Sequence, residues 1–324
     1  MDQIKWGIIG CGDVTEIKSG PAFNKVPNSS LVAVMCRNAS KAEDYARRHQ
    51  VPRWYDDANK LINDPEVNAV YIATPPSSHE QYAIAAINAG KQVYVEKPMS
   101  INYTEAFNMA KTAAAKNIKM VVAHYRREQP FFKKIKQLID EKKLGEVKLI
   151  NLLYYKAPFS KEELSIEKNA WRIDPAISGG GIFHDLAPHQ LDLMLHFFGP
   201  VEKVNGIAAS QGSAHEADDM VVGNILFRNS IAFNGAWCFN TSAEADLCEV
   251  ICSDGKISFS VFNNTRITLT GRNETTVVTF DPLQHVQQPM IGKVVEYFLE
   301  KAPNPCTADE GAEVMRLIDA FTKK

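Results

Sequence analysis

The chain has 324 residues, of which 45% are hydrophobic and 23% are charged, a balance typical of globular proteins. This composition excludes a disordered chain and a fibrous repeat, and the length predicts two domains. The formal net charge of −2 excludes the basic excess of a general nucleic-acid binder, and no apolar run is long enough to cross a membrane.

The N-terminus and the cysteines indicate where the protein resides. The N-terminal segment lacks the basic start and long apolar core of a secretory signal. Six cysteines occur without a CxxC pair, and a chain of this size has core enough without disulfides. We therefore expect reduced thiols and a cytoplasmic protein with no membrane partner. Cys248 and Cys252 lack a nearby His partner, so we also expect no metal site.

The first third of the chain alternates short Val- or Ile-rich runs with helical stretches. The runs are apolar on both faces, as buried parallel strands are, and comprise residues 4–9, 31–35, 69–73, 92–96 and 119–123. Helices are expected at 40–49, 79–89 and 104–116. This α/β alternation predicts an N-terminal doubly wound parallel sheet, the Rossmann arrangement, over residues 1–123.

The pattern changes after about residue 124. A helix at 131–142 precedes a run of strands with no helices between the later ones, at 147–155, 204–209, 220–227, 230–237, 249–253, 256–261, 265–270 and 275–280. Closing helices are expected at 290–300 and 309–321. Residues 124–324 are therefore predicted to form a C-terminal α+β domain built on a mostly antiparallel open sheet, which binds substrate and forms oligomers.

A glycine cluster follows the first expected strand. Gly10 allows a tight turn, Gly12 lets the backbone approach a pyrophosphate, and a following helix offers free N–H groups to the anion. Thr15 stands where a third glycine or alanine is usual. The context predicts a dinucleotide site that also includes Asp13 and Val14, with a plain tight turn as the alternative.

The end of the second expected strand bears on the choice of cofactor. An acidic residue there accepts a hydrogen bond from the ribose 2′-hydroxyl of NAD, but this chain has Cys36 and Arg37 instead. A guanidinium makes a forked contact with a 2′-phosphate, so we expect NADP(H) to be preferred, with NAD(H) possible. The alternative is that Arg37 only lies against the adenine with either cofactor.

Lys97 comes directly after the fourth expected strand, at residues 92–96. Ligands in open α/β sheets bind at the carboxyl ends of the strands, where a lysine can polarise a carbonyl or share a proton. The alternative is an ordinary exposed lysine.

A second cluster lies on an expected helix at 185–198. At about 100° per residue, its titratable side chains fall within one stripe roughly 60° wide on an otherwise apolar helix: Asp185, His189, Asp192 and His196. Charged groups on a buried helix need partners or a ligand. The alternatives are that Asp185 caps the helix and that His196 meets its negative end.

Taken together, the motifs resemble the glucose–fructose oxidoreductase, inositol dehydrogenase and rhizopine-catabolism family, written Gfo/Idh/MocA. The resemblance covers nearly the whole chain, and Thr15 and Cys36-Arg37 depart from the commonest pattern. Its marks in chain order are Gly10-x-Gly12, Ala73-Thr74-Pro75-Pro76-x-x-His79, Gly90-Lys91-x-Val93, Glu96-Lys97-Pro98, Gly179-Gly180-Gly181 and Asp185-x-x-x-His189-x-x-Asp192.

The resemblance implies a nicotinamide-dependent oxidoreductase that acts on a carbinol or carbonyl carbon of a sugar or polyol. It places Lys97 and His189 on either side of the reacting oxygen, with Asp185 as a third catalytic residue. The cofactor site then includes the strand-end residues Thr74, Pro75, His79, Glu96 and Lys97. The resemblance also implies a cis bond before Pro98 and homodimers or homotetramers formed through the open sheet.

Other residues are candidates for the substrate wall. Tyr125 with Arg126, and Trp171 with Arg172, offer aromatic faces and guanidinium groups to a hydroxylated ring, together with Asp185 and His189. Ordinary packing is the alternative.

Two other functions remain open: an NAD-dependent glycoside hydrolase with transient oxidation, and a non-catalytic dinucleotide sensor. Net reduction of the cofactor separates the dehydrogenase from the hydrolase.

Overall fold

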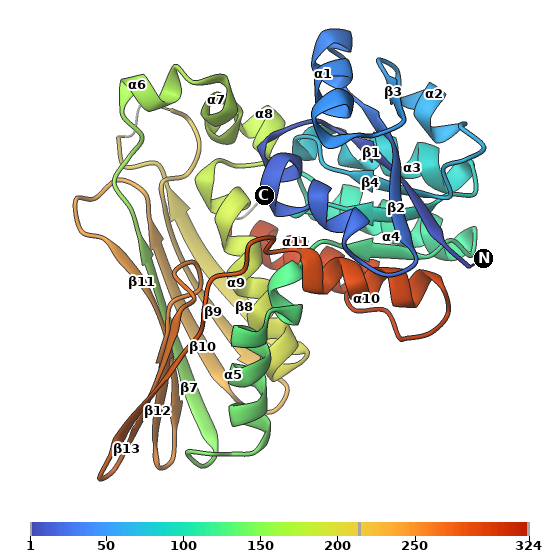
Figure 1. Ribbon diagram of the computed structural model, residues 1–324. Coiled ribbons are helices and arrows are strands. Elements are labelled where there is room, and N and C mark those ends of the chain that lie inside the picture. The colour runs from blue at the N-terminus through green and yellow to red at the C-terminus, as the bar shows by residue number, and fades with distance from the viewer. Residues whose placement is uncertain (1, 213–214, 323–324) are drawn as a thin grey trace. The chain divides into compact units, whose positions relative to one another are not determined.

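The computed structural model describes residues 2–212 and 215–322, which divide into two compact units (Figure 1). The first unit combines the chain up to Arg126 with Leu283–Met315. The second combines Arg127–Pro282 with the residues from Arg316 onward. These two units differ from the predicted division of the chain at residue 123, because Leu283–Met315 packs with the first unit. The domains 1–123 and 124–324 stay a prediction about independent folding.

The first unit is built on a six-stranded parallel sheet, which confirms the predicted doubly wound arrangement. Its strand order is β3-β2-β1-β4-β5-β6, so the order reverses between β1 and β4. The strands are β1 (Ile4–Ile9), β2 (Ser29–Met35), β3 (Arg53–Tyr55), β4 (Ala69–Ile72), β5 (Gln92–Val95) and β6 (Met120–Val122). All five strands expected in this region are present, and β3 is an addition.

The α-helices of the first unit are α1 (Ala39–His49), α2 (Ala58–Ile62), α3 (His79–Asn88), α4 (Tyr103–Ala115), α10 (Gln288–Phe298) and the start of α11 (Ala308–Thr322). Asn38 caps α1 by accepting a hydrogen bond from the Lys41 N–H, at 3.1 Å. Asn102 caps α4 in the same way, so this helix begins at Tyr103, one residue before the start expected at 104.

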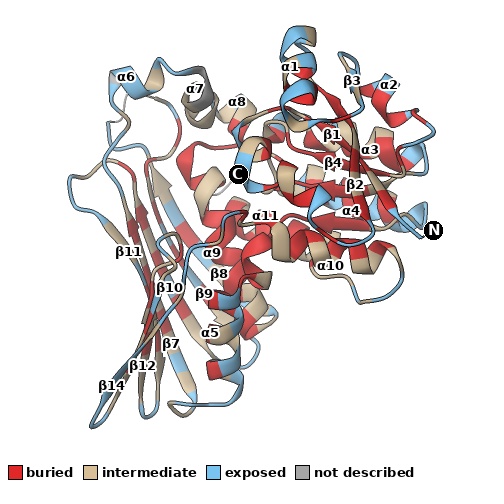
Figure 2. Cartoon of the chain, viewed as in Figure 1, coloured by how far each residue is buried: buried red, intermediate tan, exposed pale blue. Residues whose placement is uncertain are grey.

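Aromatic side chains explain why residues 283–315, the returning segment, belong to the first unit. Trp6 in β1 is fully buried, and its ring lies 4.8 Å from that of Phe23 and 5.6 Å from that of Phe298 in α10. Figure 2 shows that β1 and β4, at the centre of the first sheet, are almost entirely buried. Because α10 covers part of this apolar layer, the segment that contains it folds onto the first sheet rather than the second.

The second unit contains an eight-stranded sheet of order β14-β13-β12-β11-β7-β10-β9-β8. Every neighbouring pair is antiparallel except β7 and β10, which are parallel, so the predicted mostly antiparallel sheet is confirmed. The strands are β7 (Val147–Tyr155), β8 (Val201–Ala209), β9 (Met220–Phe227), β10 (Ala232–Cys238), β11 (Ala245–Cys252), β12 (Gly255–Phe259), β13 (Arg266–Gly271) and β14 (Thr275–Thr279).

The α-helices of the second unit are α5 (Pro130–Asp140), α6 (Lys161–Leu164), α7 (Glu167–Ile173), α8 (Pro175–Ser178), α9 (Ile182–Phe198) and the end of α11. Of these, α5, α9 and the end of α11 pack against one face of the sheet. Phe183 of α9 packs edge-on against Trp237 of β10, and Phe131 of α5 packs against Phe259 of β12. The aromatic rings of α5 and α9 thus form a core with the inner face of the sheet.

The outer face of the second sheet combines apolar side chains with a row of asparagines. Asn224, Asn234 and Asn151 stand opposite one another on β9, β10 and β7, and their amides are joined at 2.6 and 3.3 Å. Exposed apolar side chains on the same face are Ile207 (59%), Val222 (40%), Leu247 (37%) and Val277 (41%). In the described part of the chain, no helix is long and apolar enough to cross a membrane.

Candidate functional site

The candidate residues lie in both units, and each set is described within its own unit. In the first unit, the carboxyl end of β1 is followed by a turn at Gly10. The backbone of Gly10 has φ +109°, and a Cβ there would lie 2.6 Å from the Ala73 carbonyl oxygen, so only glycine fits. A Cβ on Gly12 would meet nothing within 4 Å, which leaves open space beside its backbone.

The segment after Gly12 differs from the predicted helix. It forms a short π-helical segment, Val14–Lys18, and then a 3-10 segment, Gly20–Asn24. Asp13 is exposed at its start. Thr15 is fully buried, and its hydroxyl donates to the Gly12 carbonyl at 2.8 Å, so a hydroxyl closes the turn where the usual motif has a small residue. We call residues 10–18 the glycine turn.

Cys36 and Arg37 follow β2 beside the glycine turn, because the Gly10 N–H donates to the Met35 carbonyl at 2.9 Å. Arg37 is exposed and forms no hydrogen bond or ion pair with any described residue. Its guanidinium is therefore available to a ligand at this strand end. The Cys11 thiol is buried nearby, and this burial raises its pKa to about 12, so it stays protonated.

Thr74, Pro75 and His79 follow β4, and the structure gives His79 a different position from the other two. Thr74 and Pro75 are half-buried, whereas the His79 ring is buried between two loops. Its Nε2 lies 2.8 Å from the Thr74 carbonyl and its Nδ1 lies 3.0 Å from the Pro98 carbonyl. Burial lowers the pKa of His79 to about 4, so the ring is uncharged and connects the strand ends of β4 and β5.

Glu96 and Lys97 follow β5 at the same edge of the sheet as the glycine turn. The Glu96 carboxylate is buried and accepts hydrogen bonds from the Tyr71 hydroxyl, from the Gln287 amide at 2.5 Å and from the Lys97 N–H at 3.1 Å. The bond between Lys97 and Pro98 is cis, as the resemblance predicts. Glu96 thus fixes the main chain from which the Lys97 side chain extends.

In the second unit, α9 carries the predicted stripe of titratable groups. Asp185 is paired with Arg172, whose Nε lies 3.0 Å from a carboxylate oxygen. Asp192 is paired with Arg127, whose Nε lies 3.0 Å from both carboxylate oxygens and whose Nη2 lies 2.7 Å from one of them. Each carboxylate of the stripe therefore has an arginine, and His189 lies between them.

His189 is buried, and its ring packs edge-on against Phe262, with 5.8 Å between the ring centroids. The glycines before α9 position the start of this helix. Gly181 has φ +84°, and a Cβ there would lie 2.5 Å from the Cβ of Ala217, so a side chain at this position is excluded. Asp185 and His189 are one turn apart and share a helix face.

The predicted substrate residues are divided between the units. In the second unit, the Arg172 guanidinium lies over the Trp171 ring, 4.8 Å from its centroid, and also contacts Asn169 at 3.3 Å. Trp171, Arg172 and Asp185 thus form one cluster. In the first unit, Tyr125 is buried with the Arg126 guanidinium over its ring, 5.7 Å from the centroid.

Two residues at these sites were missed from the sequence. Arg127 neutralises Asp192 from 65 positions away, and Gln287 donates to Glu96 from 191 positions away. A charged group on a buried helix needs a partner or a ligand, so a partner for Asp192 could be predicted. That the partner is Arg127 could not be predicted, because nothing in the local pattern connects the two positions.

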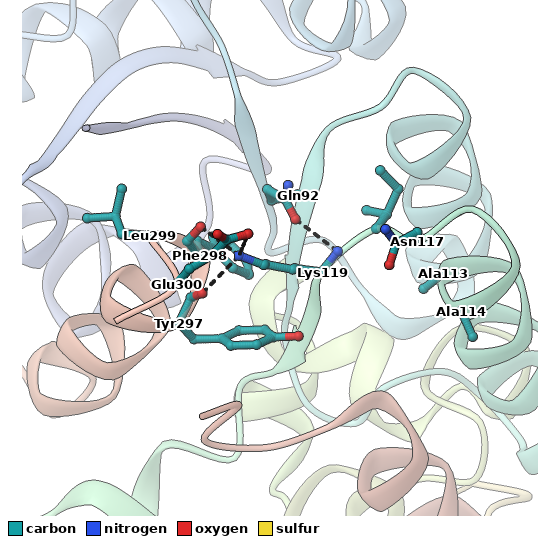
Figure 3. Close-up of a pocket in the computed structure, with 10 residues that line it drawn as sticks. Gln92, Ala113, Ala114, Asn117, Lys119, Tyr297, Phe298, Leu299 and Glu300 are labelled. Carbon is teal, nitrogen blue, oxygen red and sulfur yellow. Dashed lines mark hydrogen bonds and ion pairs between the residues drawn. The ribbon is translucent and has the colours of Figure 1, made fainter. Parts of the chain in front are cut away.

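Figure 3 shows a cavity of about 410 Å³ that is lined by residues of the first unit. It is at the amino ends of β5 and β6, beside Gln92 and Lys119, whereas the glycine turn is at the carboxyl edge. The Lys119 ammonium bonds the carbonyls of Tyr297 and Phe298 and the carboxylate of Glu300, at 3.0–3.2 Å. It caps the end of α10. Among the described residues, no cluster of His, Cys, Asp or Glu has the arrangement of a metal site.

A parallel sheet with this strand order, a glycine turn after β1 and a lysine after β5 define a dinucleotide-binding oxidoreductase of the Rossmann class. Residues 4–124 match the oxidoreductase family with an NAD-binding Rossmann fold, and residues 132–258 match the GFO/IDH/MocA C-terminal domain. The protein belongs to the GFO/IDH/MocA oxidoreductase family, as its motifs predicted.

Individual relatives agree with this assignment. The chain is 46% identical to Oxidoreductase P35 of Formosa agariphila over 98% of each chain. It is 26% identical to trans-1,2-dihydrobenzene-1,2-diol dehydrogenase of Bos taurus, over 74% of this chain and 69% of that one. The structure of levoglucosan dehydrogenase in complex with NADH and levoglucosan has the same fold, with a TM-score of 0.86, 21% identity, and coverage of 98% of this chain and 96% of that one.

Proposed function

We propose that the protein transfers a hydride between NADP(H) and a carbinol or carbonyl carbon of a sugar or polyol. The observation that carries this proposal is Lys97, which follows β5 at the sheet edge of the glycine turn and is held there by buried Glu96. Relatives named as dehydrogenases of a diol and of levoglucosan support a hydroxylated small molecule as substrate.

In this proposal, Lys97, His189 and Asp185 share the chemistry of the substrate. The nicotinamide, when bound, accepts or supplies the hydride. His189 accepts the hydroxyl proton during oxidation and returns it during reduction, because a histidine exchanges protons near neutral pH. Lys97 stabilises the negative charge that develops on the oxygen. Asp185, oriented by Arg172, binds a neighbouring hydroxyl of the substrate.

The cofactor contacts are part of the same proposal. The open backbone at Gly12, with Asp13 and Val14, faces the pyrophosphate, and Arg37 with Cys36 contacts the adenosine 2′ position. Thr74, Pro75 and Lys97 lie along the nicotinamide side, while His79 and Glu96 act from beneath by holding the backbone.

A test of this function is a screen of sugars and polyols for net NADPH formation, monitored by the absorbance of the reduced nicotinamide. We expect sustained formation with at least one class of polyol. Release of a leaving group from a glycoside without net NADPH would indicate transient oxidation instead. Binding of NADPH with no turnover of any kind would indicate a sensor.

We also propose that a second copy of the chain covers the outer face of the second sheet. The apolar side chains of Ile207, Val222 and Leu247 are exposed there beside the asparagine row, and the family resemblance implies dimers or tetramers. Light scattering should give a dimer or tetramer mass, and Val222→Lys should lower it; a monomer mass for the unchanged protein would contradict this. A cytoplasmic location stays part of the proposal.

A further inference from the structure

The chain re-enters the first unit at Leu283, and its first two buried residues, His285 and Gln287, contact the glycine turn. His285 is buried, and its Nδ1 donates to the Ile17 carbonyl at 2.7 Å. Two residues later, the Gln287 N–H donates to the Lys18 carbonyl at 3.2 Å. The end of the glycine turn is therefore held by a segment more than 260 positions away in the sequence.

The side chain of Gln287 connects this segment to the strand that carries Lys97. It is fully buried, its Nε2 donates to a Glu96 carboxylate oxygen at 2.5 Å, and its Oε1 accepts the Tyr94 hydroxyl at 3.3 Å. Both ends of the amide are thus engaged, which fixes its orientation. Gln287 contacts the glycine turn through its backbone and Glu96 through its side chain.

The Glu96 carboxylate depends on such neutral donors. It forms no ion pair with any described residue, and its three donors are the Tyr71 hydroxyl, the Gln287 amide and the Lys97 N–H. Burial, followed by the charge of Glu96, raises the pKa of Tyr71 well above its usual value, so this phenol remains a donor. A buried carboxylate without a cation is stabilised only while its hydrogen bonds are complete.

One oxygen of Glu96 receives Tyr71 and Gln287, and the other receives the Lys97 N–H. If the Gln287 amide is lost, only the Tyr71 hydroxyl holds the first oxygen, and the carboxylate is free to rotate. Its second oxygen then moves away from the Lys97 N–H. Loss of Gln287 therefore affects the Lys97 backbone through the Glu96 side chain, which lies between the two residues.

We propose that Gln287 is a positioning residue: it fixes the Glu96 carboxylate, and through it the main chain of Lys97, in register with the glycine turn. The proposal rests on the function proposed above, in which Lys97 stabilises the reacting oxygen. In this proposal, the returning segment helps to align Lys97 with the cofactor.

The test uses an exchange of donor and acceptor between the two side chains. Gln287→Glu places two carboxylates face to face, and Glu96→Gln places two amides face to face. Each single change should lower kcat by about 10-fold or more, as expected for a lost hydrogen bond to a buried charge. Each should also speed hydrogen exchange at the Lys97 amide. The double variant E96Q/Q287E again places one amide opposite one carboxylate. It should recover most of the lost kcat and most of the slow hydrogen exchange at the Lys97 amide.

Gln284→Glu is the matched control, because it makes the same chemical change at an exposed position of the same segment. We expect its kcat, its KM for the dinucleotide and its exchange at Lys97 to match those of the unchanged protein. The control separates the effect of an added charge from the loss of the Gln287 amide.

Two results would overturn the proposal. One is an unchanged exchange rate at the Lys97 amide in Gln287→Glu; the other is a lower melting temperature with kcat and exchange both intact, which shows a merely structural role. The exchange measurement needs no substrate. If the unchanged protein turns over no sugar or polyol, the proposed function fails, while exchange at Lys97 still decides whether Gln287 holds this backbone.

Discussion

Glu96 in the first unit and Asp192 in the second are both buried carboxylates near a predicted catalytic residue, but their partners differ in kind. Glu96 is bonded by a phenol, an amide and a backbone N–H. Asp192 forms an ion pair with Arg127, and the two side chains are 1% and 2% exposed. One carboxylate is stabilised by neutral donors and the other by a buried guanidinium cation.

This difference determines how each region should fail. Removing the Arg127 cation takes away the charge that offsets buried Asp192, so the second unit should lose stability. Removing one of several neutral donors leaves the others in place, so the first unit should lose alignment before it loses its fold. The predictions below test this contrast.

The largest effect is expected from Arg127→Met, which removes the buried cation that pairs with buried Asp192. Unfolding by urea should show a loss of about 3–5 kcal/mol. The double variant Arg127→Met/Asp192→Leu removes both charges and should regain most of this loss. A cost below about 1 kcal/mol, typical of an exposed pair, would mean that water reaches Asp192.

The next effect is on turnover rather than stability. Lys97→Met keeps most of the side-chain volume but removes the charge that we propose to stabilise the oxyanion. We expect kcat to fall about 10²–10³-fold while the melting temperature stays within a few degrees. Lys111→Met, at an exposed position on α4, is the control. Normal turnover by Lys97→Met would refute the catalytic assignment.

His79 should give the first unit an acid-sensitive step. Its pKa is about 4 in the folded chain against an ordinary value of 6.5, so the unfolded state binds its proton first as the pH falls. Stability is therefore expected to fall between about pH 6.5 and pH 4, by up to about 3 kcal/mol, and not further below. His79→Gln should flatten this part of the stability curve. An equally steep curve in the variant would assign the step to another group.

The smallest effect is expected at the Arg172–Asp185 pair, whose side chains are 28% and 13% exposed. Arg172→Gln should cost less stability than Arg127→Met, because solvent reaches this pair more than the Arg127–Asp192 pair. Its effect should fall on KM for the sugar or polyol, since Asp185 loses its orientation. A variant with an unchanged KM would remove both residues from the substrate site.

The sequence predicted what short-range pattern determines. The apolar runs and glycine turns identified the parallel strands, and the alternation without helices identified the second sheet. β3 was missed because it has only three residues, all of them at least partly exposed, and because its partner β2 is not adjacent to it in the sequence. The helix expected after the glycines is a short π-helical segment, Val14–Lys18, in which buried Thr15 bonds the Gly12 carbonyl.

Long-range partners account for what the sequence left unread at the candidate site. The motif residues Lys97, Asp185 and His189 follow fixed spacings, so their positions after β5 and on α9 could be predicted. The partners of the neighbouring carboxylates Asp192 and Glu96 could not, because Arg127 and Gln287 lie on other elements and their own neighbourhoods carry no signal. The return of 283–315 to the first unit is likewise a property of the packed core around Trp6.

The central claim is that the first unit binds a nicotinamide dinucleotide and that Arg37 selects its 2′-phosphate. The most direct test is titration of the unchanged protein with NADPH and NADH, following the melting temperature and assaying for nucleotide already bound. The account predicts a clear rise with both cofactors and a larger rise with NADPH. An equal or larger rise with NADH would contradict the role of Arg37, and no rise with either, in protein free of bound nucleotide, would contradict the cofactor site itself.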